Sequence, residues 1–504
     1  MSKGPEGSSG VVFTRTGMSH TYRLLLSFPV LILFACQERD AVDHAIKEVN
    51  LPADNSGESV LRRLQEEDES NAVLTISPDL KEQFKDRASG RVRGPLHGVP
   101  VLVKDNIHVE GMPTTAGSRA LLQNIARADA PIIFNLRRAG AIIAGKTNLS
   151  EWANFRSTSS TSGWSSVGGL TTNPHDDSRT ACGSSSGSAA AVGSGLVDIA
   201  IGTETDGSIT CPAAMCGIVG MKPTVGLLSG EGIVPIAASQ DTAGPMTRNV
   251  TLAARMLSAM AGDEATDYEA ALDASALKGV RLGVLLPLCG TYGDAVAETF
   301  AVARKTLEAA GATLVEIERI PDLGRISQLE WALLLREFKR DLNNYLSQTP
   351  SGVETRTLAD LIAFNKEHAA EVMPYFGQEV FEQSEATRGG SDPELPDIIA
   401  EAKRLAGPEG IDRMLTEHDC DALIAPTTGK AFPVSLEEGD SYEGSCTRLP
   451  AVSGYPHLTV PMGLADGLPV GLSFMGPAFA EARLLALGFA YEQARRKGDQ
   501  GRGK

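Results

Sequence analysis

The sequence predicts one large α/β domain that follows an N-terminal export segment. Hydrophobic residues make up 42% of the 504-residue chain, which is ample for a large buried core. Short apolar runs alternate with helical patterns, and the stretch from 281 to 317 reads strand, helix, strand, the signal of a parallel sheet. No internal repeat and no clear linker divides the chain, so a single domain is the simplest account.

An apolar run of 12 residues, Leu24 to Ala35, follows Arg23 near the N-terminus. It is too short to span a bilayer but has the length of a signal-peptide core. The residues LFAC, which end at Cys36, resemble the lipobox in which a bacterial lipoprotein carries its lipid. We therefore expect residues 1–36 to direct export to the periplasm or cell envelope, with Met18 as the more natural start. The alternative is an N-terminal helix that packs on the body.

Residues 37–494 are expected to form the domain, and the basic tail 495–504 to be flexible. Val60 and Leu64 have helical spacing, and the run Val99 to Val103 predicts a buried strand that ends at Lys104. The later elements are, in chain order, a helix over 131–139, a strand over 141–144, a loop over 171–182, a helix from Ser188, a strand over 197–202, a helix-rich region over 326–418, three strands at 421–428, 456–463 and 468–476, and a helix over 479–494.

Charge and cysteine usage exclude several classes of function. The formal net charge of -17 repels phosphate backbones, so no nucleic acid partner is expected. The seven cysteines form no CxxC pair and no zinc-like cluster with histidine, so no metal is expected either. We interpret them as free or buried thiols, of which Cys182 lies beside the candidate site described below and is open to thiol reagents.

Two pattern matches indicate other chemistry. Residues 140–147 fit the phosphate-loop pattern GxxxxGK[ST], but a helix precedes them and their apolar interior favours a buried strand. Residues 183–187 fit the nucleophile-elbow pattern GxSxG, with Ser185 as nucleophile. An elbow follows a strand, whereas a loop is expected before Ser185. The first match is interpreted as chance, and the second remains the alternative enzyme hypothesis.

The stretch from 182 to 227 carries the stronger signal. A Gly/Ser loop and a second Gly-Ser turn flank one predicted helix and one predicted strand, a layout that can bring Ser184 and Ser208 together. Glycines also let backbone amides converge on one point, as an oxyanion hole requires. Gly/Ser loops are often merely flexible, so these residues alone leave the question open.

Several segments in the right order resemble the amidase signature family. They are CGSSSGS with GTETDGSIT and GMKPT in the stretch just described, GPLHGVPVLVKDNI around Lys104, GKTNLSEWANF at 145–155, and SGYPHLTVPMG with GLPVGLSFMG near the C-terminus. The resemblance implies the amidase signature fold, a single catalytic domain whose large mixed β-sheet is flanked by helices on both faces. It also implies a Ser-Ser-Lys triad that hydrolyses amides without a cofactor.

The resemblance assigns roles residue by residue. Lys104 matches the family's base and Ser184 its bridging serine, while Ser208 matches its nucleophile. Thr203 matches a threonine that supports the bridging serine. The matching oxyanion donors are the backbone amides of Thr205, Asp206, Gly207 and Ser208. The alternative role of Lys104 is a structural cation that pairs with Asp105.

The sequence departs from the family pattern where Cys182 and Ser186 replace glycines. Asp206 replaces another glycine and is expected to place a carboxylate at the mouth of the oxyanion hole. The segments GTETDGSI and SQDTAGPM resemble the peptide amidase branch, which implies that the substrate is a peptide C-terminal carboxamide or a similar small amide. Besides the Ser185 esterase, the remaining alternative is a non-catalytic envelope binding protein on an amidase scaffold.

Overall fold

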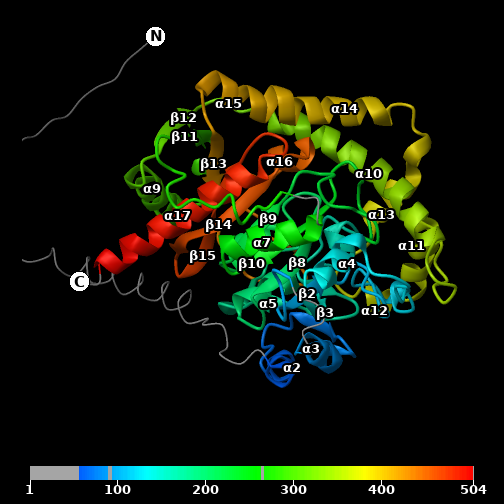
Figure 1. Cartoon of the computed structure of the whole chain (residues 1–504). Coiled ribbons are helices and arrows are strands. Elements are labelled where there is room, and N and C mark those ends of the chain that lie inside the picture. Colours follow the sequence, from blue (N-terminus) through cyan, green and yellow to red (C-terminus); the bar gives the residue numbers. More distant parts are fainter. Residues whose placement is uncertain (1–55, 89–93, 263–265, 503–504) are drawn as a thin grey trace, which may run out of the picture. The chain divides into compact units, whose positions relative to one another are not determined.

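The computed structural model describes residues 56–88, 94–262 and 266–502. The predicted export segment, Cys36 and residues 503–504 lie outside these ranges. The described residues belong to one compact unit, which is built around an eleven-stranded sheet (Figure 1). Within these ranges no helix is long and apolar enough to cross a membrane.

The sheet is mixed, as the sequence predicts. Its strand order is β1-β3-β2-β8-β10-β9-β14-β15-β13-β11-β12. β2 runs parallel to both β3 and β8, and β11 runs parallel to both β12 and β13, whereas the other neighbours are antiparallel. The strands are β1 (Val73–Ile76), β2 (Pro100–Lys104), β3 (Ile142–Thr147), β8 (Ile199–Glu204), β9 (Val219–Lys222), β10 (Thr242–Thr247), β11 (Arg281–Leu285), β12 (Thr313–Ile317), β13 (Ala422–Pro426), β14 (His457–Ala465) and β15 (Leu468–Met475).

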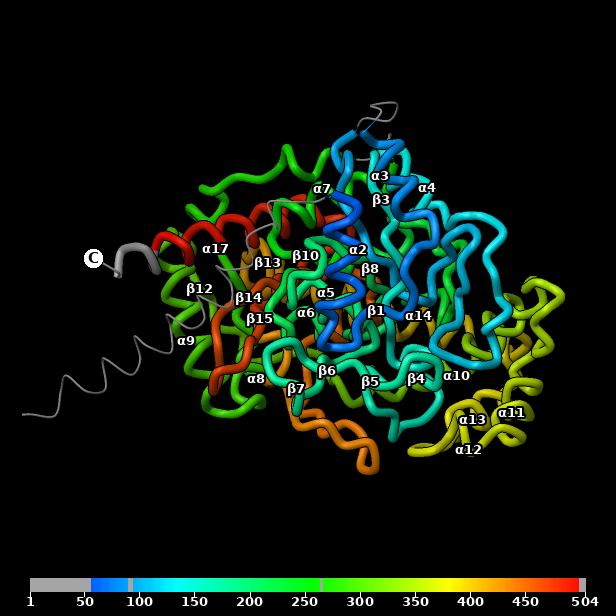
Figure 2. Tube along the Cα trace, turned by 90° about the horizontal axis from the view of Figure 1, so that it is seen from below, coloured from blue at the N-terminus to red at the C-terminus, as the bar shows by residue number. Residues whose placement is uncertain are grey.

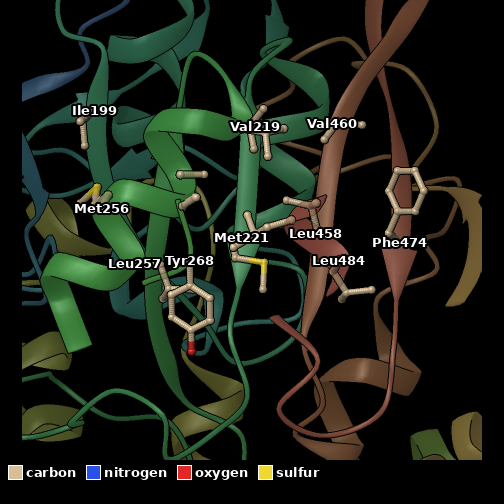
Figure 3. Close-up of a cluster of buried hydrophobic side chains, with 14 of the residues drawn as sticks. Ile199, Val219, Met221, Met256, Leu257, Tyr268, Leu458, Val460, Phe474 and Leu484 are labelled. Atoms are coloured by element: carbon tan, nitrogen blue, oxygen red, sulfur yellow. The ribbon is translucent and has the colours of Figure 1, made fainter. Parts of the chain in front are cut away.

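One face of the sheet is covered by four helices: α4 (Pro131–Arg138), α7 (Val250–Ala261), α9 (Asp294–Ala309) and α17 (Glu481–Arg502). Side chains alternate between the two faces of a strand, so Val101 and Val103 enter this layer while Leu102 enters the opposite one. Figure 3 shows Met221 of β9, Leu458 of β14 and Leu484 of α17 packed together in this core.

The other face carries two groups of helices. The first packs on the half of the sheet that contains β2 and β8, and Figure 2 shows it from below: α2 (Gly57–Glu66), α3 (Leu80–Ala88), α5 (Ser186–Gly193) and α6 (Thr210–Met215). The second group packs beside β13: α10 (Leu323–Ser347), α11 (Leu358–Glu367), α12 (Ala369–Val372), α13 (Glu379–Ala386), α14 (Leu395–Ala406), α15 (Arg413–His418) and α16 (Arg448–Ser453). Helices on both faces confirm the predicted amidase signature architecture.

Local chemistry fixes the ends of several helices. Asn249 caps α7 by accepting a hydrogen bond from the Leu252 amide, and Asp322 caps α10 in the same way. Pro131 begins α4, and Gly140 lets the chain turn after it with φ at 94°. The smaller elements are α8 (Leu286–Cys289), the short turns η1 (Arg119–Leu121), η2 (Glu151–Asn154), η3 (Gly389–Ser391) and η4 (Gly407–Asp412), and the short strands β4 (Trp164–Ser165), β5 (Gly169–Leu170), β6 (Thr172–Asn173) and β7 (Asp176–Thr180).

Two expectations need correction. The stretch 171–182 is not simply a loop, because β6 and β7 form an antiparallel hairpin within it. The terminal helix is longer than predicted and runs to Arg502. The interpretation of residues 140–147 is confirmed: they contain the buried strand β3, whose Lys146 forms an ion pair with Asp105 at 2.8 Å.

Candidate active site

Lys104 lies at the end of β2, in the middle of the sheet, and is fully buried. Its Nζ donates hydrogen bonds to Ser184 Oγ at 2.7 Å and to Thr203 Oγ1 at 2.8 Å. A third bond, at 3.2 Å, goes to the carbonyl oxygen of Thr203. Because β2 and β8 are parallel neighbours, Lys104 and Thr203 emerge at the same edge of the sheet. The amine is thus held in one position by three oxygens.

Burial lowers the pKa of Lys104 from 10.5 to about 7, and the charges of Asp241 and Glu204 oppose this shift. Among the described residues no carboxylate oxygen forms an ion pair with Lys104, since Asp105 pairs with Lys146 instead. The alternative role of Lys104, a structural cation paired with Asp105, is therefore wrong. A neutral amine that touches a serine hydroxyl can accept its proton.

Ser184 lies in the Gly/Ser loop before α5, where the Gly183–Ser184 peptide bond is cis. A Cβ added to Gly183 would collide with the hydroxyl of Ser150, so only glycine fits there. Cys182 forms a disulfide bond with Cys211 of α6. The interpretation of all the cysteines as free thiols is therefore wrong for this pair, and Cys182 is not open to thiol reagents. The bond ties the Ser184 loop to the helix that follows Ser208.

Ser208 lies half-buried in the turn between β8 and α6. The buried carboxylate of Glu204 fixes this turn, because Glu204 Oε2 accepts hydrogen bonds from the amides of Ile209 at 2.8 Å and Thr210 at 2.9 Å. Gly207 adopts a φ of 78°, which favours glycine. The amide of Ser185 donates to the carbonyl oxygen of Ser208 at 3.2 Å and so joins the two serine loops.

The structure brings Lys104, Ser184 and Thr203 into direct contact, and the backbone brings Ser208 beside them. Among the described residues no hydrogen bond links the hydroxyls of Ser184 and Ser208. The role expected for Thr203 needs correction. Its hydroxyl contacts Lys104 and accepts from Asn106 Nδ2 at 2.9 Å rather than contacting Ser184, so Thr203 holds the lysine.

The oxyanion turn is supported by residues that the sequence did not single out for this role. Thr205 Oγ1 donates to the buried carboxylate of Asp241 at 2.6 Å, and Gln240 Nε2 donates to the carbonyl oxygen of Thr205 at 3.2 Å. Burial raises the pKa of Asp241 to about 7. Asp241 and Gln240 stand in the segment SQDTAGPM, which marks the branch resemblance. That resemblance gave the segment no structural role, and Glu204 and Asn106 had no signal of their own.

Ser185 does not fit the nucleophile of an elbow. It is fully buried, its hydroxyl donates to the carbonyl oxygen of Thr203 at 3.1 Å, and it accepts from the amide of Thr203 at 3.2 Å. These bonds tie Ser185 to β8 and direct its hydroxyl away from solvent. Among the described residues no cluster of histidine, cysteine or acidic side chains could hold a metal ion.

A family model described as Amidase matches residues 57–485. This chain belongs to the amidase family. As a family member it is an enzyme, an amidase that hydrolyses amide bonds. The comparisons give no support to a GxSxG esterase or to a non-catalytic binding protein.

The amidase is similar to proteins of known name across most of its length. It is 38% identical to a probable amidase of Arabidopsis thaliana, with 84% of this chain and 82% of that protein covered. Among solved structures it is similar to a peptide amidase in complex with the competitive inhibitor chymostatin, with 46% identity, a TM-score of 0.84, and 90% and 97% of the two chains covered. The native peptide amidase of Stenotrophomonas maltophilia gives 45% identity and a TM-score of 0.83, with 90% and 96% covered.

The transamidating branch of the amidases is less similar in structure. The corresponding component of the glutamyl-tRNA(Gln) amidotransferase of Thermotoga maritima has 26% identity and a TM-score of 0.64, with 90% and 94% of the two chains covered. The predicted similarity to the amidase signature family, and to peptide amidases within it, is thereby confirmed.

Proposed function

We propose that this amidase removes the C-terminal carboxamide of peptides, or of similar small amides, through a Ser-Ser-Lys triad and an acyl-enzyme, with release of ammonia. One observation carries the proposal: the buried Lys104 amine donates at 2.7 Å to Ser184, beside the glycine turn that holds Ser208. The 46% identity to a peptide amidase supports the class of substrate.

The first half-reaction forms the acyl-enzyme. A serine hydroxyl is a weak nucleophile until a base takes its proton. In the proposed relay, Ser208 passes its proton to Ser184 Oγ as Ser184 passes its own to Lys104 Nζ. Ser208 Oγ then bonds to the carboxamide carbon. The carbon–nitrogen bond breaks as the relay returns a proton to nitrogen, and ammonia leaves.

The oxyanion is the charge that the site must stabilise. The amides of Thr205, Asp206, Gly207 and Ser208 lie in the turn that Glu204 fixes at its far end. Fixed amide donors stabilise a developing oxyanion without reorganising during the reaction. In the second half-reaction, water gives a proton to the relay, attacks the acyl carbon and releases the peptide acid and Ser208.

One experiment tests the proposal. The purified enzyme is incubated with acetyl-Ala-Phe-amide, with the same peptide as a free acid, and with simple aryl and fatty amides, and products are read by mass. Conversion of the peptide amide to its acid, with the internal bonds intact, is expected. Turnover of simple amides alone would refute the carboxamide specificity. Labelling by a fluorophosphonate in the wild type but not in Ser208→Ala is expected for the nucleophile.

We propose further that the enzyme is exported and loses its N-terminus at or before Cys36, with Cys36 as the candidate lipid site. The disulfide between Cys182 and Cys211 supports export, because such bonds persist mainly in oxidising compartments. N-terminal sequencing and mass analysis of the mature protein test this. Recovery of intact Leu24–Ala35 peptides from mature cytosolic enzyme would refute it.

A further inference from the structure

Two oppositely charged side chains lie beside the turn that carries Ser208. Asp206 precedes Ser208 by two residues, and Arg448 begins α16. Arg448 Nε lies 4.0 Å from Asp206 Oδ2, and the two side chains are 39% and 22% exposed. The pair is thus in reach of solvent at the turn that the proposed function assigns to the oxyanion.

Buried contacts fix the position of this pair. Arg448 Nε donates to Glu330 Oε2 of α10 at 3.0 Å, and Glu330 Oε1 accepts from Gln240 Nε2 at 3.1 Å. Gln240 in turn donates to Thr205 at the start of the turn. A Cβ built on Gly207 would lie 3.3 Å from the hydroxyl of Thr447, so the residue before Arg448 packs on the turn itself.

The pair retains hydrogen-bonding capacity that the protein does not use. Oδ1 of Asp206 is buried and accepts no hydrogen bond from the described residues, so the exposed part of the carboxylate is on the side of Oδ2. The terminal Nη atoms of Arg448 donate to no described residue, since its hydrogen bond to Glu330 uses Nε. An accessible acceptor therefore stands next to an accessible donor.

A peptide offers the matching groups. In an extended chain the N–H and C=O of one residue point to the same side, which is why facing residues of an antiparallel pair exchange both bonds. An aryl or fatty amide has no such pair beyond the carboxamide that is cleaved. We propose that Asp206 accepts the N–H and Arg448 donates to the C=O of one substrate residue on the acyl side. The pair thereby selects peptide amides over simple amides, an inference that rests on the proposed function.

The test compares two substrates with the same reacting group. Acetyl-Ala-Phe-amide carries peptide groups on the acyl side, whereas 3-phenylpropionamide keeps the carboxamide and the phenyl ring without them. Values of kcat/KM are measured for the wild type, Asp206→Ala and Arg448→Ala. Both variants keep the backbone amides of the turn. Arg325→Ala, which breaks the exposed ion pair of Arg325 with Glu401, is the matched control.

The expected result is selective. Each variant should lose about 10- to 100-fold on the peptide amide, the range for a hydrogen bond to a charged group, and less than about threefold on 3-phenylpropionamide. Asp206→Asn, which keeps one acceptor oxygen, should lose less than Asp206→Ala. Arg325→Ala should match the wild type on both substrates.

Three outcomes would overturn the inference. Equal losses on both substrates would mean that Asp206 and Arg448 only hold the turn. Unchanged kinetics on the peptide amide would mean that the pair does not touch the substrate, while the proposed function would stand. A wild-type enzyme that cleaves only 3-phenylpropionamide would refute the proposed carboxamide specificity as well, so the two failures are distinguishable.

Discussion

The assignment of Lys104 as a neutral base makes a sharp prediction for Lys104→Arg. Arginine keeps the positive charge and can still donate to oxygens, but it cannot accept a proton near neutral pH. A structural cation would be replaced well by arginine, whereas a base would not. We expect Lys104→Arg and Lys104→Ala to be equally poor enzymes, with kcat reduced by about two to four orders of magnitude, the usual range for loss of a general base.

The structure gives the size of the benefit that burial brings. With a pKa of about 7, about half of the Lys104 side chains are neutral at pH 7. At the ordinary lysine value, roughly one in 3,000 would be neutral. Burial therefore raises the population of competent base by about three orders of magnitude. Since the neutral amine is the active form, activity should rise with pH through about 7 and fall about tenfold per unit well below it.

The assay is ammonia release from acetyl-Ala-Phe-amide, with kcat/KM measured from about pH 5 to pH 9 so that the profile covers the expected pKa. Circular dichroism and the melting temperature show whether each variant folds. Lys366→Arg, at an exposed lysine of α11, is the matched control and should behave as the wild type. A folded Lys104→Arg enzyme with near-normal activity, or a wild-type profile that is flat from pH 5 to 9, would refute the assignment.

Three other predictions concern the surroundings of the base. Asp241→Asn removes a charge that raises the pKa of Lys104, so the acid limb of the pH profile should move to lower pH; an unmoved limb would contradict this coupling. Replacing Cys182 and Cys211 by alanine opens a link across 29 residues and should cost about 3–4 kcal/mol of unfolding free energy by denaturant titration, and an unchanged midpoint would argue against the bond. Gly183→Ala should abolish activity by displacing the Ser184 loop, which residual turnover at the wild-type rate would disprove.

The strands that carry the site can be predicted from the sequence because their signals are local. The apolar run before Lys104 predicts a strand that ends at the lysine, and the structure has β2 there. The helix after the Gly/Ser loop and the strand before Thr203 are predictable for the same reason. The motif resemblance then supplies the pairing of Lys104 with Ser184, which composition and periodicity alone cannot give.

Contacts between distant segments have no such local signal. The spacing of cysteines does not determine which of them pair, so the bond between Cys182 and Cys211 could not be predicted. Asp241 reaches Thr205 across 36 positions of sequence. The resemblance assigns Thr203 to the wrong partner because its side chain orientation depends on how β8 lies beside β2. Each error concerns the direction of a side chain rather than the presence of an element.

The helical stretch from α10 to α15 leaves the sheet after β12 and returns to it at β13. Both of these strands pair with β11, so the excursion starts and ends at one common support. The strands that position Lys104 and Thr203 lie in the other half of the sheet and owe nothing to its length. An engineer could therefore graft a different helical excursion between residues 318 and 421 to reshape the outer wall, provided that the contact of Glu330 with Arg448 is rebuilt, and leave the proton relay untouched.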